Sequence, residues 1–213
     1  MTGLTRPYSL LPPMVKFLLI ANGLMFALEL SYGNQLIAAL ALWPLNMTAT
    51  PSIEFMQPHF QLFQLVTYGF LHGSVMHLLL NMYALWLFGS RMENLWGSRT
   101  FAIYYFVCVL GAGLVQLSVS ALSGGYYPTI GASGGVFGLL LAFGMKFPND
   151  VMILIFPPMK LKAKWFVSIY AAIELWAGVT GSAAGVAHFA HLGGMFFGFL
   201  LILYWNRYPP RFR

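Results

Sequence analysis

Six runs of apolar residues follow one another along the chain, separated by stretches that contain proline, glycine or charged residues. Each run is close to the roughly 20 residues that an α-helix needs to cross the hydrocarbon core of a bilayer. The pattern predicts an all-α membrane protein with one membrane domain over residues 1–213. Its six transmembrane helices are expected at about 14–32, 74–92, 100–122, 131–147, 165–181 and 186–206.

Two connections contain apolar residues of their own. The longest, about 33–73, mixes three prolines with large apolar and aromatic residues. This mixture is typical of a structured loop at the membrane interface rather than of a free linker. Between the fourth and fifth helices, the apolar run from Val151 to Phe156 lies among prolines, Asn149 and Asp150, and it is too short to span.

The composition excludes a soluble domain. Hydrophobic residues make up 59% of the chain and charged residues only 8%, against roughly 25% charged in soluble proteins. The length of 213 residues is expected to leave no room for a second, soluble domain. The single Cys108 excludes an intramolecular disulfide. Because the first apolar run is followed by further spans, a retained helix is favoured over a cleaved signal peptide.

The basic residues fall on alternate connections. The connections at about 33–73, 122–130 and 181–187 contain no Lys or Arg. The positive-inside rule therefore places both termini in the cytoplasm. This placement accounts for the formal net charge of +6 without a nucleic-acid partner. All 11 basic residues lie on the predicted inner side: Arg6, Lys16, Arg91, Arg99, Lys146, Lys160, Lys162, Lys164, Arg207, Arg211 and Arg213.

Polar side chains gather near the starts of the second, fourth and sixth predicted helices. By the topology above these starts lie on the external side, within about 10 Å of one level at 1.5 Å of rise per residue. Polar groups inside a bilayer are costly and indicate function. A hydroxyl and an imidazole at one depth can form a nucleophile and its base. The residues are His77, Asn81, Ser133, His188 and His191.

Small residues line one face of the helices that carry Ser133 and His191. His191, Gly194 and Gly198 stand at i, i+3 and i+7. Gly134, Gly138 and Ala142 recur every four residues after Ser133. If these smooth faces meet, Ser133 and His191 come within hydrogen-bonding distance.

Explanations other than catalysis stay open for these residues. The stretch Gly131–Gly135 is also typical of a tight helix crossing without catalysis. His188 and His191, with His72 and His77, permit a metal site. However, the chain has no H-E-x-x-H motif, and the helices that carry these histidines have no carboxylate near their level. We therefore predict neither a metal nor a cofactor.

A transporter or channel would use the same polar groups as a permeation path. Charged residues midway through the predicted bundle are confined to Glu29 and Glu174, neither with an evident partner in the sequence. This scarcity disfavours a permeation path.

Three motifs together resemble the rhomboid family of intramembrane serine proteases, in what looks like its minimal six-helix bacterial-type form. The second helix carries His72-x4-His77-x3-Asn81, the fourth carries Gly131-Ala132-Ser133-Gly134, and the sixth carries Ala190-His191-Leu192-Gly193-Gly194. A G-x-S-G motif alone is weak, but three motifs in the right order on the right spans are specific. The resemblance covers essentially the whole chain.

The resemblance implies a role for each site residue. Ser133 is the nucleophile and His191 its general base, while His77, Asn81 and the backbone N–H of Ser133 bind the oxyanion. Such donors are worth roughly 10² to 10³ in rate each. No carboxylate is placed to complete a triad, which agrees with a dyad. The carboxylates are Glu29, Glu54, Glu93, Asp150 and Glu174, and the supporting residues of the site are Gly131, Phe137, Gly194 and Gly198.

The resemblance also implies partners and a location. The substrates are transmembrane segments of other membrane proteins, cleaved near the external face, and the surroundings are the lipid bilayer. The expected location is the plasma (bacterial inner) membrane, with the site toward the external or periplasmic side. A non-catalytic relative that only binds membrane proteins would lack the serine or the histidine, and this chain has both Ser133 and His191.

The chain departs from the family pattern at two places. Phe63-Gln64 stands where a Trp-Arg pair is common, so the family's anchoring of the first loop does not carry over. Phe137 replaces a frequent tyrosine, so it can stack on His191 but offers no hydroxyl. Glu93 matches an acid of the family and is expected to hold helix ends through Arg91 or backbone groups.

Overall fold

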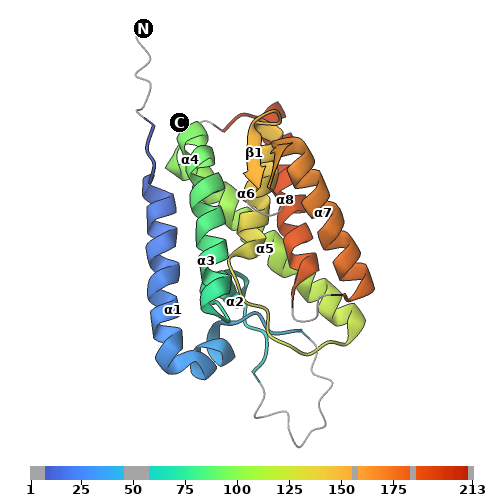
Figure 1. Ribbon diagram of the computed structural model, residues 1–213. Helices are drawn as coiled ribbons and strands as arrows, with labels where there is room; N and C mark the ends of the chain where they lie inside the picture. Colours follow the sequence, from blue (N-terminus) through green and yellow to red (C-terminus); the bar gives the residue numbers. More distant parts are fainter. Residues whose placement is uncertain (1–7, 46–57, 155–157, 183–185, 211–213) are drawn as a thin grey trace, which may run out of the picture.

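The helices of the computed structural model form an antiparallel bundle (Figure 1). The structure describes residues 8–45, 58–154, 158–182 and 186–210. Each predicted apolar run contains a helix, and α3, a π-helical turn η3 and α4 continue one another through the second run. The elements are α1 (Pro13–Leu40), α2 (Gln64–Thr67), the 3-10 turn η2 (Tyr68–Phe70), α3 (Val75–Ala84), η3 (Leu85–Gly89), α4 (Ser90–Trp96), α5 (Ser98–Ser123), α6 (Ser133–Lys146), β1 (Val151–Leu154), β2 (Met159–Lys162), α7 (Ala163–Thr180) and α8 (His188–Arg207).

Three of these helices, α1, α5 and α8, are long and apolar enough to cross a membrane. A fourth span results if α2–η2 and α3–α4 are taken as one span bent by 101°. Helix α6 is apolar but has only 14 residues. The chain is therefore a largely helical membrane protein with three to four candidate spans, and the count of six stays a prediction.

A small β-hairpin corrects the all-α prediction. Strands β1 and β2 pair antiparallel, from Val151 opposite Lys162 to Leu154 opposite Met159. The run predicted to be too short to span is β1 with two residues beyond it, and its valine and isoleucine favour a strand. Figure 1 shows the hairpin at the end of the bundle where α6 ends and α7 begins.

The first connection begins later than predicted. Helix α1 continues to Leu40 through a kink at Tyr32, whose φ of −126° and ψ of 24° are not helical. No proline stops the helix between 33 and 40. Residues 46–57 of the predicted loop lie outside the described part of the chain.

The side chain of Gln64 anchors what is described of this connection. Its Oε1 accepts hydrogen bonds from the backbone N–H of Gln61 at 3.1 Å and of Trp43 at 3.3 Å. Its Nε2 donates to the carbonyls of Ala39 at 3.2 Å and His59 at 3.4 Å. Gln64 is 1% exposed, so it satisfies buried backbone groups on both sides of the connection. A neutral amide thus anchors the loop where the family commonly has a Trp-Arg pair.

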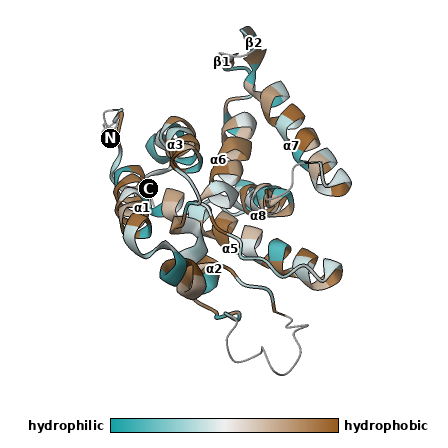
Figure 2. Ribbon diagram, turned by 60° about the horizontal axis from the view of Figure 1, so that its bottom comes forward, coloured by the Kyte–Doolittle hydropathy of each residue, from teal (hydrophilic) through white to brown (hydrophobic). Residues whose placement is uncertain are grey.

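Glycines let α8 lie directly on its neighbours. A Cβ added at Gly194 would collide with the carbonyl oxygen of Gly134, so the backbones of α6 and α8 touch there. The expected meeting of two smooth faces is seen at this point. Gly198, one turn on, instead faces Tyr104 and Cys108 of α5. Figure 2, which views the helices closer to end-on, shows α8 beside both α6 and α5.

Charged side chains connect the elements at the end of the bundle where α1 begins and α4 meets α5. The Glu93 carboxylate accepts from the backbone N–H of Met14 at 2.9 Å and of Val15 at 2.8 Å, in the first turn of α1. It also accepts from the Ser98 hydroxyl at 2.5 Å. Glu93 therefore holds helix ends through backbone groups, one of the two expected arrangements. Arg91 pairs instead with Asp150, at 2.8 Å.

The basic residues of the described chain lie toward this same end. It contains the start of α1, the junction of α4 and α5, the hairpin and the end of α8 (Figure 1). Arg6, Arg211 and Arg213 lie outside the described residues. The bundle thus has one basic end, and which compartment that end faces stays a prediction.

Candidate active site

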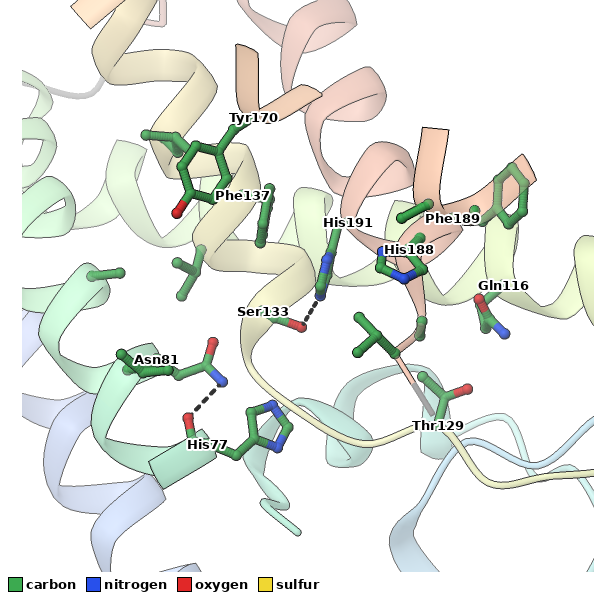
Figure 3. A pocket seen from close by; sticks show the side chains of 18 of the residues that line it. His77, Asn81, Gln116, Thr129, Ser133, Phe137, Tyr170, His188, Phe189 and His191 are labelled. Atoms are coloured by element: carbon green, nitrogen blue, oxygen red, sulfur yellow. Dashed lines mark hydrogen bonds between the residues drawn. The ribbon is translucent and has the colours of Figure 1, made fainter. Parts of the chain in front are cut away.

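Ser133 and His191 meet where α6 and α8 begin. Ser133 is the first residue of α6 and His191 lies in the first turn of α8. Ser133 Oγ and His191 Nε2 are 2.8 Å apart, a hydrogen-bonding distance (Figure 3). The contact of Gly194 with Gly134 one turn along brings the two helices close enough for this bond.

Gly131 shapes the approach to Ser133. Its φ of +122° is a conformation that residues with a side chain rarely adopt. A Cβ at this position would also lie only 2.9 Å from atoms of the His77 ring. Gly131 therefore lets the chain turn into α6 while the His77 imidazole packs against the turn, next to Ser133.

His77 and Asn81 come from the first two turns of α3. Ser74 caps this helix, accepting from the His77 N–H at 3.1 Å. Asn81 is buried, and its Nδ2 donates to the His77 carbonyl at 3.1 Å, which leaves its second amide hydrogen for another acceptor. Both side chains line one cavity with Ser133 and His191 (Figure 3).

The cavity measures about 1290 Å³ and is lined by residues of α3, α5, α6, α7 and α8, among other segments. The start of α6 adds backbone donors to it. The first bond within this helix runs from the Val136 N–H to the Ala132 carbonyl. The N–H groups of residues 133–135 therefore have no acceptor four residues earlier. Together with the dipole of α6, these donors favour a negative charge beside Ser133.

The ring of Phe137 stacks on the imidazole of His191. The two rings stack with centroids 4.2 Å apart and planes inclined by only 6°. Phe137 lies one turn after Ser133 on α6, so the predicted stacking is observed. It restricts the rotation of the His191 ring without contributing a hydrogen bond.

A carboxylate absent from the predicted site joins it in the structure. Glu174 Oε2 is 2.9 Å from His191 Nδ1 and 2.7 Å from His188 Nδ1. No carboxylate was expected at this level on the helices that carry the histidines, and Glu174 lies instead on α7. The expectation that no carboxylate is placed to form a triad is wrong.

The order of the helices explains why Glu174 lies beside His188 and His191, and the sequence could have predicted it. Glu174 lies six residues before the end of α7, and His188 and His191 lie in the first turn of α8. Because α7 and α8 are antiparallel neighbours, residues near the end of one face residues near the start of the next. Counting depth back from the connection would have placed Glu174 beside the histidines.

The same three residues form the one potential metal-binding group found among the described residues. The ligand atoms of Glu174, His188 and His191 lie within 4.8 Å of one another. His72 and His77, which the sequence also offered, do not belong to the group. The rings of His72 and His77 instead pack edge to face, with their centroids 5.0 Å apart.

These features define a class of protein: a helical membrane protein with a serine and a histidine hydrogen-bonded at the wall of a cavity. The comparisons with known proteins identify its family. The Rhomboid domain matches residues 59–208, and the chain belongs to the rhomboid family.

Curated relatives share this region. The chain is 34% identical over 146 residues to the presenilin-associated rhomboid-like protein, mitochondrial, of Bos taurus, covering 63% of this chain and 36% of the relative. It is 36% identical over 140 residues to RHOMBOID-like protein 4 of Arabidopsis thaliana, covering 65% and 32%. It is 32% identical over 145 residues to rhomboid protein 1, mitochondrial, of Saccharomyces cerevisiae, covering 62% and 38%. The match spans about a third of the length of each relative.

The names of these relatives correct the predicted location. The proteins from Bos taurus, Homo sapiens and Saccharomyces cerevisiae are all named as mitochondrial. These names speak against a bacterial plasma membrane. The prediction of a plasma membrane is therefore wrong. It rested on the apparent minimal six-helix form, which says nothing about which organelle holds the protein.

Proposed function

We propose that this chain is a serine endopeptidase that cleaves transmembrane segments of other membrane proteins inside the bilayer. The observation that carries the proposal is the hydrogen bond of 2.8 Å between Ser133 Oγ and His191 Nε2 at the wall of a cavity. Membership of the rhomboid family supports the same reaction. The chain uses no cofactor in this mechanism.

The reaction follows from the geometry of this pair. Ser133 Oγ attacks the carbonyl carbon of the scissile peptide while its proton passes to His191 Nε2. The resulting oxyanion collapses, the C–N bond breaks, and His191 returns the proton to the leaving nitrogen. A water molecule then attacks the acyl carbon and gives a proton to His191. The bond between that carbon and Ser133 Oγ breaks, His191 returns the proton to Oγ, and the carboxylic product leaves.

The oxyanion would form beside the start of α6 and the side chains of His77 and Asn81. The backbone N–H of Ser133, the free amide hydrogen of Asn81 and the ring N–H of His77 are the proposed donors. Their value lies in being fixed before the charge develops. The low dielectric of the surrounding helices strengthens each of these interactions.

Replacing Asn81 with alanine is expected to lower kcat by roughly 10²-fold, because one donor to the oxyanion is lost. KM should change little, since the charge exists only in the transition state. Steady-state cleavage of a fluorogenic transmembrane peptide in detergent measures both constants. Asn94→Ala, the same change at a half-buried, hydrogen-bonded amide at the basic end of the bundle, is the matched control and should leave kcat near the wild-type value. A normal kcat in Asn81→Ala would remove Asn81 from the proposed oxyanion site.

We propose six membrane crossings with the basic end of the bundle on the inner side. The positive-inside rule supports this orientation. The cavity then opens toward the opposite side, where water for hydrolysis is available. A substrate helix has to unwind to present its peptide carbonyl, because its backbone hydrogen bonds shield every peptide group.

A fluorophosphonate probe tests the proposal directly. The purified wild-type protein in detergent should lose activity and gain one adduct, which mass spectrometry should locate on Ser133. Heat-denatured protein is the control, because a probe that reacts only with an activated serine does not label it. Folded protein that stays unlabelled, or that is labelled at another serine, would contradict the proposed function.

A further inference from the structure

Glu174 lies at the end of a line of hydrogen bonds that leads to the proposed nucleophile. Its Oε2 is 2.9 Å from His191 Nδ1, and the other ring nitrogen of His191 is 2.8 Å from Ser133 Oγ. Glu174 is 8% exposed and His191 9%, so water competes little for these contacts. The line crosses three helices, from α7 through α8 to α6.

The carboxylate decides which nitrogen of His191 carries the proton. An ionised carboxylate only accepts hydrogen bonds, so the Nδ1 atom that faces it carries a hydrogen. In a neutral imidazole the other nitrogen, Nε2, then has the lone pair. That lone pair points at the Ser133 hydroxyl, and a general base needs this arrangement.

His188 completes the surroundings of the carboxylate. Its Nδ1 lies 2.7 Å from the same Oε2, so one oxygen accepts from two imidazoles of α8. A carboxylate within a membrane bundle is costly unless hydrogen bonds compensate it. His188 and His191, in one turn of α8, compensate the Glu174 carboxylate and fix its position relative to that helix.

We propose that Glu174 is a positioning residue of the active site, acting through His191 so that the chain works with a Ser-His-Glu triad rather than a dyad. The proposal rests on the proposed protease function. Glu174 keeps the proton on His191 Nδ1, aims Nε2 at Ser133, and stabilises the imidazolium that forms when His191 takes the serine proton. No proton moves onto Glu174 at any step.

A metal ion is the competing explanation for this cluster. Coordination through both Nδ1 atoms would remove their protons and place the hydrogen of His191 on Nε2. That nitrogen would then donate to Ser133 and could not accept its proton. A metal at this position would therefore oppose the base that the hydrogen bond to Ser133 indicates.

The central test compares kcat and KM for variants at Glu174 in the full chain. Glu174→Leu removes both the acceptor and the charge, and kcat is expected to fall by about 10²- to 10⁴-fold with KM nearly unchanged. Glu174→Gln keeps a hydrogen-bond acceptor without the charge, so its kcat should fall less than that of Glu174→Leu. Glu174→Asp keeps the charge on a side chain shorter by about 1.5 Å, and should be more active than Glu174→Leu.

Two controls separate positioning from a structural role. Glu93→Gln makes the same chemical change at another buried carboxylate, at the basic end of the bundle, and should lower the unfolding temperature without lowering kcat. His188→Leu removes the other donor to Glu174 but leaves its contact with His191. If Glu174 only fastens α7 to α8, His188→Leu and Glu174→Leu should lower kcat alike, and that result would overturn the proposal.

Metal analysis tests the alternative of a metal site, and probe labelling separates failure of the positioning role from failure of the protease function. About one zinc ion per chain, with activity lost on chelation and restored by zinc, would overturn the proposal, whereas activity unaffected by EDTA supports it. The rate of fluorophosphonate labelling of Ser133 should fall in Glu174→Leu as kcat does. If wild-type protein is labelled and active but folded Glu174→Leu has the same kcat, the positioning role fails and the protease function stands. If wild-type protein is not labelled, the protease function itself fails.

Discussion

Replacing Ser133 with alanine is expected to reduce cleavage of a transmembrane substrate by at least about 10⁴-fold, to the background rate. The substitution removes the oxygen that forms the acyl bond, and no other hydroxyl is hydrogen-bonded to His191 among the described residues. Removing one atom should leave the fold intact, because the side chain is small and lies beside a cavity. Mass spectrometry of the cleavage products from a reconstituted substrate measures the effect.

Two further variants make this result specific. Ser90→Ala removes a buried hydroxyl from α4 at the basic end of the bundle, and its activity should match the wild type. Ser133 and His191 act as a unit, so the double variant Ser133→Ala with His191→Ala should be no slower than Ser133→Ala alone. Undiminished cleavage by Ser133→Ala would rule out the proposed nucleophile.

Adding a methyl group at Gly194 is expected to lower both stability and activity. The Cβ of Gly194→Ala would overlap the carbonyl oxygen of Gly134, and neither backbone can rotate away as a side chain can. Overpacking costs about 1–3 kcal/mol even where side chains can yield. The helices α6 and α8 must therefore separate, which lengthens the contact between Ser133 and His191. Misplacement by about 1 Å is enough to lower activity by roughly 10²-fold.

Gly23→Ala is the matched control for Gly194→Ala. Gly23 lies within α1, and a Cβ there would meet no atom within 4 Å. Alanine in an open helical position favours the helix by roughly 0.8–1 kcal/mol over glycine. Thermal unfolding in detergent should show a lower midpoint for Gly194→Ala and an unchanged or higher one for Gly23→Ala. Wild-type stability and activity in Gly194→Ala would contradict the close contact of α6 and α8.

Much of the proposed site could be predicted because its motifs are local. Ser133 follows the turn at Gly131, and His191 precedes Gly194 by one helical turn. Such spacings place a polar group and the small residues around it on one helical face. The stacking of Phe137 on His191 was predictable for the same reason, since both rings lie within one turn of the contact between the two helices.

The part of the site that was missed depends on the register between helices. Glu174 has no motif around it, and its role follows only from the depth at which α7 passes α8. Gln64 was seen as a loss of the family's anchor, yet its amide meets four backbone groups that the folded connection brings together. The hairpin was missed because a short apolar run between breakers does not reveal its pairing partner.

The sequence by itself determined that the chain resides in lipid, roughly where its helices lie, and which serine and histidine are candidates for a pair. Hydrophobicity and helical periodicity are local properties, and the scarcity of charge leaves the bilayer as the environment. Only the tertiary structure decided that Gly194 touches Gly134, that Gly198 turns to α5, and that Glu174 meets both His188 and His191. These contacts join residues far apart in the chain, and their distances are determined by how the helices pack rather than by any spacing along the sequence.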